Sequence, residues 1–224
     1  DLSDKLWVNP GEIAGNGLDD DNNGYIDDVN GWDFVNADNA PADDNGHGTQ
    51  VAGIVAASTD NGAGIAGGCW ACRVMPVKAM QASGVANYSD IAAGVLYAAQ
   101  KGARVINLSL GGYSYSSALD AAIQAAADTY GAVVVAGAGN DNVDSAFYPA
   151  AYDSVLAVAG IDQSDAKAAL SNFGTWVDVS APAVTIRTTF LGGDYGTVDG
   201  TSFATPFVAG IAGLLRSQNP TWSH

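Results

Sequence analysis

The second half of the chain alternates between short apolar segments and segments whose apolar residues recur at helical spacing. Residues 132–137 contain no polar side chain and residues 105–110 are mostly apolar, which is typical of strands buried on both faces of a sheet. Residues 117–130, between them, carry apolar residues at helical spacing. Strands of this kind that alternate with helices form a parallel sheet covered on both sides. The alternation therefore predicts an α/β fold of three layers, with a mostly parallel central sheet and helices on both faces.

The other predicted elements continue this alternation. Residues 1–46, rich in Gly, Asn and Asp, predict loops. The chain has 224 residues, of which 48% are hydrophobic, and it shows no linker or internal repeat, so a single domain over residues 1–224 is the simplest interpretation. Helices are predicted over residues 47–57, 89–100 and 202–218, strands over 73–80, 155–160 and 176–179, and a β-hairpin within 183–198.

The net charge of the chain limits the classes of partner that it can bind. Its 8 basic and 24 acidic residues give a formal net charge of −16. A surface this negative repels nucleic acid and anionic membranes, so we expect neither as a partner. Apolar runs such as residues 203–215 are shorter than the roughly 18 residues that cross a bilayer, and no signal peptide is visible. We expect a monomer, whose targeting segment has already been removed if the protein is exported.

Two cysteines, Cys69 and Cys72, form a Cys-x-x-Cys pair. Such a pair can be a redox centre, half of a metal site or a disulfide across a short loop. A structural zinc site needs about four protein ligands, and the only histidines are His47 and His224. A redox motif of the thioredoxin type would open a helix, whereas residues 73–80 predict a strand. Two buried thiols or a local disulfide remain, and we favour the disulfide.

Three polar residues far apart in the chain match the needs of nucleophilic catalysis. That chemistry uses a hydroxyl, an imidazole that takes its proton and donors for an oxyanion. His47 opens a predicted helix, Ser202 begins the last predicted helix, and Asn140 follows an apolar strand. Taken singly, each has an ordinary structural role, such as a helix cap or a turn former. Their occurrence together indicates a serine hydrolase.

The sequences around these residues resemble the subtilase family of serine peptidases. Residues 46–49 (Gly-His-Gly-Thr), 138–140 (Ala-Gly-Asn) and 200–206 (Gly-Thr-Ser-Phe-Ala-Thr-Pro) resemble three motifs of that family, in the family's order. The resemblance implies that His47 is the general base, Ser202 the nucleophile and Asn140 the oxyanion donor. It further implies a secreted endopeptidase that hydrolyses proteins and peptides through an acyl-enzyme.

The resemblance also implies a set of substrate-binding residues. One segment would pair with an extended substrate as an edge strand, two segments would form the walls of the primary specificity pocket, and an apolar pocket would lie further along the peptide. Ordinary core packing is the alternative role for the apolar members. Phe147, near the base of the primary pocket, would disfavour very large side chains. The edge strand would comprise Ser83, Gly84 and Val85. The walls of the primary pocket would be Ser109, Leu110, Gly111 and Gly112 on one side and Ala136, Gly137 and Ala138 on the other. The further apolar pocket would be lined by Tyr88, Ile91 and Leu110.

Two departures from the family pattern lie next to the catalytic motifs. Phe203 follows the expected nucleophile where many relatives carry methionine. Because methionine at that place is a site of oxidation, its replacement predicts tolerance of peroxide. Gln50 stands where histidine is frequent, and we expect this change to be harmless.

A more serious departure concerns the triad aspartate. In relatives, an Asp-Thr-Gly or Asp-Ser-Gly strand end lies shortly before the residues that match Asp1 and Leu2, and no such tripeptide occurs in this chain. Because the family's aspartate strand lies in mid-sheet, we expect unpaired backbone groups on its neighbours. We expect a domain that lacks this N-terminal strand and a C-terminal helix. The alternative function is a catalytically dead or fragmentary homologue that acts as a calcium-dependent binding module.

Acidic residues cluster near the start of the chain beyond what solubility requires. Residues 19–28 read Asp-Asp-Asp-Asn-Asn-Gly-Tyr-Ile-Asp-Asp, with oxygen-bearing side chains at alternate positions and a glycine at the sixth, as in loops that wrap Ca²⁺. A solvated acidic turn is the alternative. The resemblance implies a second calcium site that includes Asp1 and Asn61. The ligands predicted in the first site are Asp19, Asp21, Asn23, Tyr25, Asp27 and Asp28.

Two other enzyme classes fit less well. Residues 62–67 match the Gly-x-Gly-x-x-Gly pattern of dinucleotide-binding proteins, but they follow a helix and precede a strand, which is the reverse of the required context. An α/β-hydrolase would need a second glycine after the nucleophile, and Ala204 occupies that position. Both are set aside in favour of the peptidase.

Overall fold

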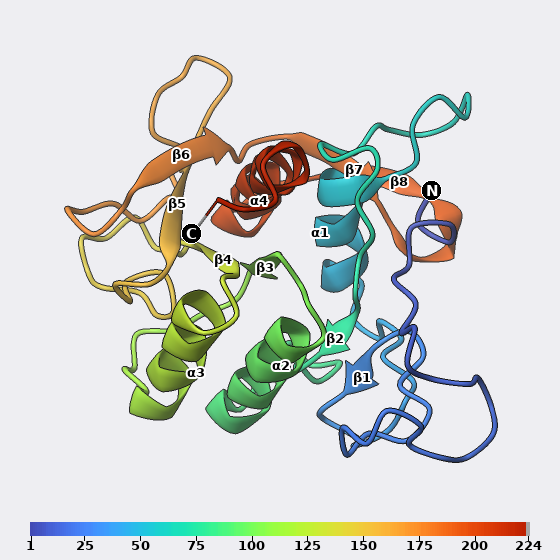
Figure 1. Cartoon of the computed structure of the whole chain (residues 1–224). Helices are drawn as coiled ribbons and strands as arrows, with labels where there is room; N and C mark the ends of the chain where they lie inside the picture. The colour runs from blue at the N-terminus through green and yellow to red at the C-terminus, as the bar shows by residue number, and fades with distance from the viewer. Residues whose placement is uncertain (223–224) are drawn as a thin grey trace.

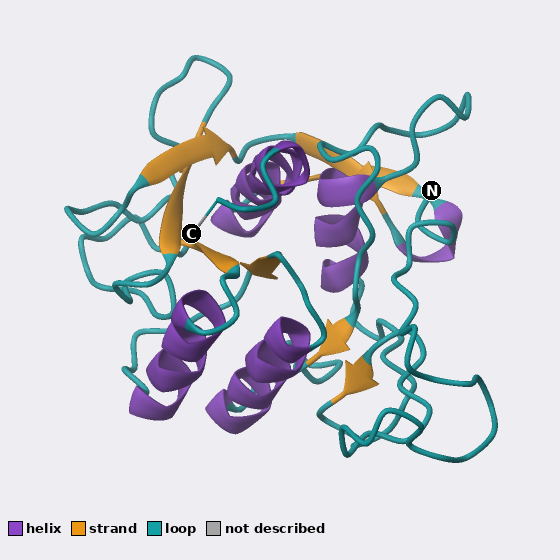
Figure 2. Cartoon of the chain, viewed as in Figure 1, coloured by secondary structure: helices purple, strands orange, loops and turns teal. Residues whose placement is uncertain are grey.

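The computed structural model describes residues 1–222 (Figure 1). Helices and strands alternate through most of the chain, and loops dominate the first 46 residues (Figure 2). The helices are α1 (His47–Ala56), α2 (Tyr88–Gln100), α3 (Ser117–Asp128) and α4 (Thr201–Gln218), with a 3₁₀ turn at Leu191–Gly193. The strands are β1 (Trp32–Asp33), β2 (Val77–Lys78), β3 (Val105–Leu108), β4 (Val133–Gly137), β5 (Leu156–Ile161), β6 (Val179–Pro182), β7 (Ile186–Thr189) and β8 (Tyr195–Val198).

The main sheet is four-stranded, in the order β3-β4-β5-β6, and all its strands are parallel. Helix α4 packs against all four strands, and α1 packs against α4. Helices α2 and α3 lie side by side on the opposite face (Figure 1). This arrangement is the predicted three-layer α/β fold. Among the helices of residues 1–222, none has the length and hydrophobicity that a membrane-crossing helix needs.

Helix α3 illustrates why these segments fold as they do. The side chain of Ser116 caps the helix, because its Oγ accepts a hydrogen bond of 3.3 Å from the backbone N–H of Leu119. Leu119, Ile123 and Ala126 recur at helical spacing and are fully buried. They join a core cluster that includes Val134 of β4. The cap at Ser116 and the buried apolar face therefore both stabilise this helix.

Two predicted strands differ from the structure. Of residues 73–80, only Val77–Lys78 forms a strand, paired with β1. The strand predicted at 176–179 is displaced to β6, because a turn at Gly174, with φ of 152°, occupies the preceding residues. Asp178 then holds the entry to β6 through its Oδ2, which accepts from the Ala157 N–H at 2.8 Å. The predicted hairpin is found as the antiparallel pair β7–β8.

The sheet is interrupted between β2 and β3. Within residues 1–222, β1 and β2 form one sheet and β3–β6 another, and no ladder joins them. We call the cavity between the two the interstrand slot. It measures about 1100 Å³, and its lining includes Arg73–Gln81 on one side, Ala103–Leu110 on the other, Val51, Ala52 and Val55 of α1, and Gly94, Val95 and Ala98 of α2.

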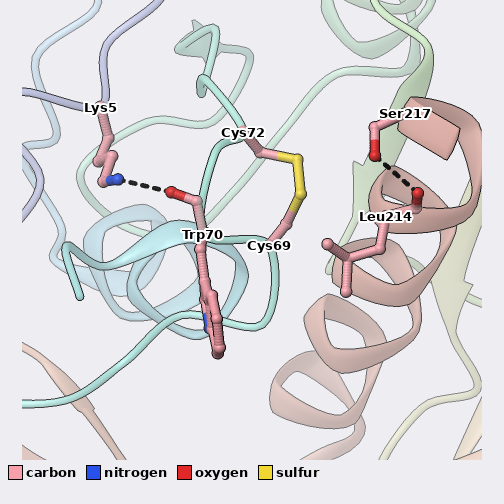
Figure 3. The surroundings of a disulfide bond; sticks show 6 residues. All are labelled: Lys5, Cys69, Trp70, Cys72, Leu214 and Ser217. Carbon is pink, nitrogen blue, oxygen red and sulfur yellow. Dashed lines mark hydrogen bonds between the residues drawn. A yellow bond between two sulfur atoms is a disulfide. The ribbon is translucent and has the colours of Figure 1, made fainter. Parts of the chain in front are cut away.

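The two cysteines form a disulfide, the state that we favour from the sequence (Figure 3). Their Cα atoms lie 5.3 Å apart, and Cys69 is buried. Gly213 of α4 faces both sulfurs, since a Cβ added there would lie 3.0 Å from Cys72 Sγ and 3.2 Å from Cys69 Sγ. The absence of a side chain at Gly213 therefore lets the disulfide loop pack directly on α4. Lys5 secures the loop by donating from its Nζ to the Trp70 carbonyl at 2.8 Å.

Candidate active site

A cleft of about 460 Å³ lies at the carboxyl ends of β3 and β4. In α/β sheets this end of the strands is the usual place for ligands. His47, Asn140 and Ser202 all line this cleft. The structure therefore brings together three residues that are separated by more than 60 positions in the chain.

His47 is the first residue of α1, and the segment before it is held by one carboxylate. Asp43 accepts hydrogen bonds from the backbone N–H groups of Gly46 and Thr49, both at 2.7 Å, and from the Thr49 hydroxyl at 2.7 Å. Gly46 has φ of 101°, a left-handed conformation that favours glycine. Burial raises the pKa of Asp43, but these hydrogen bonds outweigh it, and the pKa lies below its ordinary value. Asp43 therefore acts as an ionised cap for α1.

The imidazole of His47 is mostly buried against Phe203, with ring centroids 5.5 Å apart. Burial lowers the pKa of His47, and the charge of Asp43 only partly opposes this effect. Within residues 1–222, no carboxylate forms a hydrogen bond with this imidazole; the Asp43 oxygens are used by backbone and Thr49 donors. The imidazole is therefore neutral at pH 7, as a general base must be, but no carboxylate orients it.

Ser202 lies in the first turn of α4, after Gly200, whose φ of 145° only glycine adopts readily. Pro206 lacks the N–H that would bond to the carbonyl four residues earlier, so the Ser202 carbonyl is free for another donor. Ser109 Oγ donates to it at 2.7 Å, and Ser202 Oγ donates to the Ser109 carbonyl at 3.3 Å. This reciprocal pair ties the start of α4 to the end of β3.

The side chain of Asn140 is oriented by two hydrogen bonds. Its Oδ1 accepts from the Thr201 backbone N–H at 2.8 Å and from the Thr201 hydroxyl at 3.1 Å. Two donors at one end of the amide identify that end as the oxygen. Among the described residues, no acceptor takes the hydrogens of the Asn140 Nδ2. A free amide donor therefore lies beside Ser202, at the positive end of the α4 dipole, as an oxyanion requires.

The structure divides the expected substrate-binding residues into two groups. Ala136 and Ala138 are fully buried, and Gly112 pairs with Tyr148 in an antiparallel bridge. Ser83 and Val85 are exposed on either side of a tight turn at Gly84, and do not form a strand. None of these five lines the cleft. Those that do are Gly84, Tyr88, Ile91, Ser109, Leu110, Gly111, Gly137 and Phe147.

Phe147 occupies the region between the two walls of the expected primary pocket. A Cβ added at Gly111 would overlap its ring, and one added at Gly139 would lie 3.1 Å from it. Tyr113 packs against the same ring edge-on, with centroids 5.1 Å apart. The Tyr113 hydroxyl donates to Asp141 at 2.5 Å. The Phe147 ring is therefore held in place and fills the space between the two expected walls.

The cleft also includes residues that the sequence analysis missed. Thr201 was recoverable, because it belongs to the motif around Ser202 and its hydroxyl faces Asn140. Met80 and Ala86 line the cleft because they form an antiparallel bridge beside it, and no local sequence pattern predicts this bridge. The full missed set is Asn45, Met80, Ala86, Leu119, Gly139, Tyr148, Pro149 and Thr201.

Four of the predicted calcium ligands make hydrogen bonds or ring contacts within and beside the acidic loop. Asp19 accepts from the N–H groups of Asn23 and Gly24, and Asp27 accepts from those of Gly15, Asn16 and Gly17. Asn23 turns its Oδ1 to the N–H of Tyr25 and its Nδ2 to Asp28. The Tyr25 ring packs on Trp32. These four side chains therefore shape the loop.

Three carboxylates converge instead at Glu12, Asp21 and Asp28, with oxygens within 4.8 Å of one another. Glu12 was not expected from the sequence. Asp28 is fully buried, and among the described residues Glu12 Oε2 and Asp21 Oδ1 are buried without a hydrogen-bond partner. Burial raises the pKa of Asp21, but hydrogen bonds from Lys101 and Asn9 outweigh it and leave the pKa below its ordinary value. The two free oxygens and an excess of negative charge suit a hard cation such as Ca²⁺.

Asp1 and Asn61, expected in a second calcium site, lie in direct contact. Asn61 Nδ2 donates to Asp1 Oδ1 at 2.7 Å, and the Tyr195 hydroxyl donates to Asp1 Oδ2 at 2.5 Å. Both carboxylate oxygens therefore already have protein donors.

The fold and the cleft place Ser202 at the start of one helix and His47 at the start of its neighbour, an arrangement typical of a class of serine hydrolases. The sequence profile of the subtilase family matches residues 1–224, and the chain belongs to that family. It is 49% identical over 190 residues to a thermophilic serine proteinase of Bacillus sp. (strain AK1), covering 85% of this chain and 47% of that protein. It is 46% identical over 196 residues to thermitase of Thermoactinomyces vulgaris, covering 88% and 70%.

Two solved protease structures are also similar to this chain. A cold adapted subtilisin-like serine proteinase matches with a TM-score of 0.78 and 37% identity, over 86% of this chain and 69% of that one. A protease from Pseudoalteromonas arctica matches with a TM-score of 0.76 and 37% identity, over 79% and 60%. The chain thus has the subtilisin-like fold, and it spans about half the length of the Bacillus sp. enzyme.

Proposed function

We propose that this chain carries the acyl-transfer site of a serine endopeptidase that cleaves proteins and peptides. The observation that carries the proposal is the free Nδ2 donor of Asn140 beside Ser202, in the cleft that His47 also lines. Few structural roles need an amide whose oxygen accepts two hydrogen bonds while its N–H donors have no acceptor. An oxyanion needs that arrangement.

The chemistry follows from these three side chains. Ser202 Oγ attacks the scissile carbonyl carbon while the imidazole of His47 takes the hydroxyl proton. The carbonyl oxygen becomes an oxyanion, which Asn140 Nδ2 and backbone N–H groups at the start of α4 stabilise. When the intermediate collapses, His47 gives the proton to the departing amine and an ester remains on Ser202. Water then attacks this ester in the same way and releases the acid.

We propose that the primary pocket accepts small side chains on the acyl side of the cleaved bond. Phe147 and Gly111 are in close contact, so a large substrate side chain would have to displace the ring. The observed contacts support a preference for alanine-sized residues over aromatic ones.

A second candidate function has an observation in its favour. His47 lacks a carboxylate partner within residues 1–222, and a triad without its aspartate loses about 3 × 10⁴ in turnover. A chain with such a loss could act as a calcium-dependent binding module. The site chemistry favours the peptidase, because a binding module has no use for a free oxyanion donor.

A fluorophosphonate probe distinguishes the two functions. The peptidase predicts covalent labelling of Ser202, located by mass spectrometry, and no labelling of the Ser202→Ala variant. Labelling elsewhere, or equal labelling of the variant, would reject the peptidase. A folded chain that stays unlabelled while it binds calcium and peptide would support the binding module.

Calcium belongs to the same proposal. Glu12, Asp21 and Asp28 would hold the ion, which supplies charge neutralisation for the buried carboxylates and braces the loop before α1. Lys101 competes for this role, since its Nζ contacts Asp21 and lies 3.8 Å from Asp28. A second site at Asp1 and Asn61 is the weaker expectation, because both Asp1 oxygens are already bonded.

The remaining expectations concern context. We also propose a single-domain, secreted protein; its net charge of −16 supports a monomer that avoids nucleic acid and anionic membranes. Sedimentation at several concentrations would test the monomer, and a stable dimer would reject it.

A further inference from the structure

The chain has five Asn-Gly sequences, and one of them differs from the others in its hydrogen bonds. In such a sequence the backbone nitrogen of the glycine can attack the side-chain amide carbon of the asparagine, because glycine has no side chain to obstruct the approach. Asparagine belongs to the thermolabile residues of proteins, and this reaction is one cause. The five asparagines are Asn16, Asn23, Asn30, Asn45 and Asn61.

Four of the five glycines donate their backbone N–H to an acceptor in the folded chain. Three of these N–H groups bond to carboxylate oxygens at 2.7–2.8 Å. The N–H of Gly31 bonds to the Asp28 carbonyl at 3.4 Å. A nitrogen held in this way must give up its hydrogen bond before it can attack, which slows the reaction. The three carboxylate pairs are Gly17 with Asp27, Gly24 with Asp19, and Gly46 with Asp43.

Gly62, which follows Asn61, is the exception. Among the described residues, no acceptor takes the backbone N–H of Gly62. Gly62 and both of its neighbours in the chain are exposed, and a Cβ added at Gly62 would meet no atom within 4 Å. The Gly62 nitrogen is therefore free to approach the Asn61 side chain, and water can reach the product.

The side chain of Asn61 is already placed for this attack. The N–H of Ala63 donates to Asn61 Oδ1 at 3.1 Å, in a turn that brings the side chain near the Gly62 nitrogen. The same donor stabilises the negative charge that develops on this oxygen when the nitrogen adds to the amide carbon. Three of the other asparagines form equivalent turns. The free N–H of Gly62 is therefore the feature that distinguishes this site.

We propose that Asn61 is a site of spontaneous deamidation in the folded protein. The Gly62 nitrogen forms a bond to the Asn61 amide carbon, and the bond from that carbon to the amide nitrogen breaks. The proton of the Gly62 nitrogen leaves with the amide nitrogen, as ammonia. Water then opens the cyclic imide at either of its carbonyls, which gives aspartate or isoaspartate at position 61.

The product changes a contact with Asp1. In the structure, Asn61 Nδ2 donates to Asp1 Oδ1 at 2.7 Å. Deamidation removes this donor and puts a second carboxylate beside that of Asp1, and like charges this close repel each other. The loop of residues 59–65 should therefore be held less firmly against Asp1 after the reaction.

The test compares the five sites within one sample. The Ser202→Ala variant is incubated below its melting temperature in mildly alkaline buffer with a chelator. Neither self-cleavage nor calcium at Asp1 and Asn61 then affects the outcome, which is independent of the proposed peptidase activity. Peptide mass spectrometry follows the conversion of each asparagine, and a sample denatured in urea gives the unfolded rates. Asn61 should convert in the folded protein at close to its unfolded rate, and the three sites with carboxylate acceptors about tenfold more slowly, because a hydrogen bond to a charged acceptor must break first.

Two variants test the cause of the difference. Asp19→Ala frees the N–H of Gly24 and should raise the rate at Asn23 toward that at Asn61. Asp153→Ala, at an exposed position, is the matched control and should leave the rates at all five sites unchanged.

Two results would overturn the proposal. One is conversion of Asn61 in the folded protein no faster than that of the three sites with carboxylate acceptors. The other is an Asn23 rate that stays low in a folded Asp19→Ala variant. If Asp19→Ala fails to fold, the ranking of the five sites in the Ser202→Ala protein decides alone.

Discussion

We expect Asn140 to have two separable roles, and two substitutions distinguish them. Its Oδ1 accepts from the N–H and the hydroxyl of Thr201, which holds the start of α4, and its Nδ2 is free to donate to an oxyanion. Asn140→Ala removes both functions. Asn140→Asp keeps an acceptor for Thr201 but replaces the donor with a carboxylate, which repels an oxyanion.

The magnitudes follow from the contacts. Loss of one oxyanion donor slows acylation by about 10²–10³, so both variants should react at least that much more slowly. Loss of two ordinary hydrogen bonds costs about 1 kcal/mol each. Asn140→Ala should therefore melt about 4–8 °C lower, at roughly 2–4 °C per kcal/mol for a domain of this size. Asn140→Asp should melt within about 2 °C of the parent.

The assay is the second-order rate of fluorophosphonate labelling at Ser202, read by intact-protein mass spectrometry, with a thermal melt on the same samples. Thr201→Val is the matched control: it removes the hydroxyl that contacts Asn140 and accepts from the Gly139 N–H but keeps the Asn140 Nδ2 donor, so it should leave the labelling rate within about threefold. If Asn140→Ala reacts as fast as the parent, the amide has no part in acylation and the reasoning fails.

Four further predictions concern the same molecule. Phe147→Ala should raise acylation by substrates with phenylalanine at the cleaved bond relative to those with alanine; an unchanged ratio in a peptide-library assay would place the pocket elsewhere. Chelation should lower the melting temperature of the parent and of a surface control, Asp153→Asn, but not of Glu12→Gln; equal shifts in all three would remove calcium from this site. Dilute peroxide should spare the labelling of Ser202 and should abolish it in Phe203→Met, and rapid loss in the parent would contradict this. The labelling rate should rise with pH to a plateau and be half-maximal below pH 6.5, because burial lowers the pKa of His47 and only the neutral imidazole accepts the proton; a midpoint above 6.5 would disagree.

Local sequence patterns predicted the regular elements well, and for a physical reason. In α3 the cap at Ser116 and the spacing of Leu119 and Ile123 agree with the burial that the sheet imposes. The β7–β8 hairpin likewise depends on residues close in sequence. The predicted strand at 73–80 failed because a strand also needs neighbours, and β1 pairs with only two of its residues.

The candidate sites also combine residues that local motifs predict with residues whose positions depend on contacts between distant segments. Motif residues such as His47 and Ser202 meet in the cleft because the sheet aligns their helices. The metal candidates could be predicted only in part. The position of Glu12 depends on its Oε1, which accepts from the N–H groups of Asp20 and Asp21 across a loop that has no periodic pattern. Asp19 and Asp27, which are candidates by spacing, also accept from backbone donors of the same loop, and their part in metal binding stays a prediction.

The central claim is that one reacting carbonyl is served by His47, Asn140 and Ser202 together. A crystal structure of the phosphonylated protein tests it most directly, since the bound phosphoryl oxygen mimics the oxyanion. We expect this oxygen within about 2.7–3.1 Å of Asn140 Nδ2, and the His47 imidazole within hydrogen-bonding reach of Ser202 Oγ. A phosphoryl oxygen that points to solvent, with the imidazole beyond reach of Ser202, would contradict it.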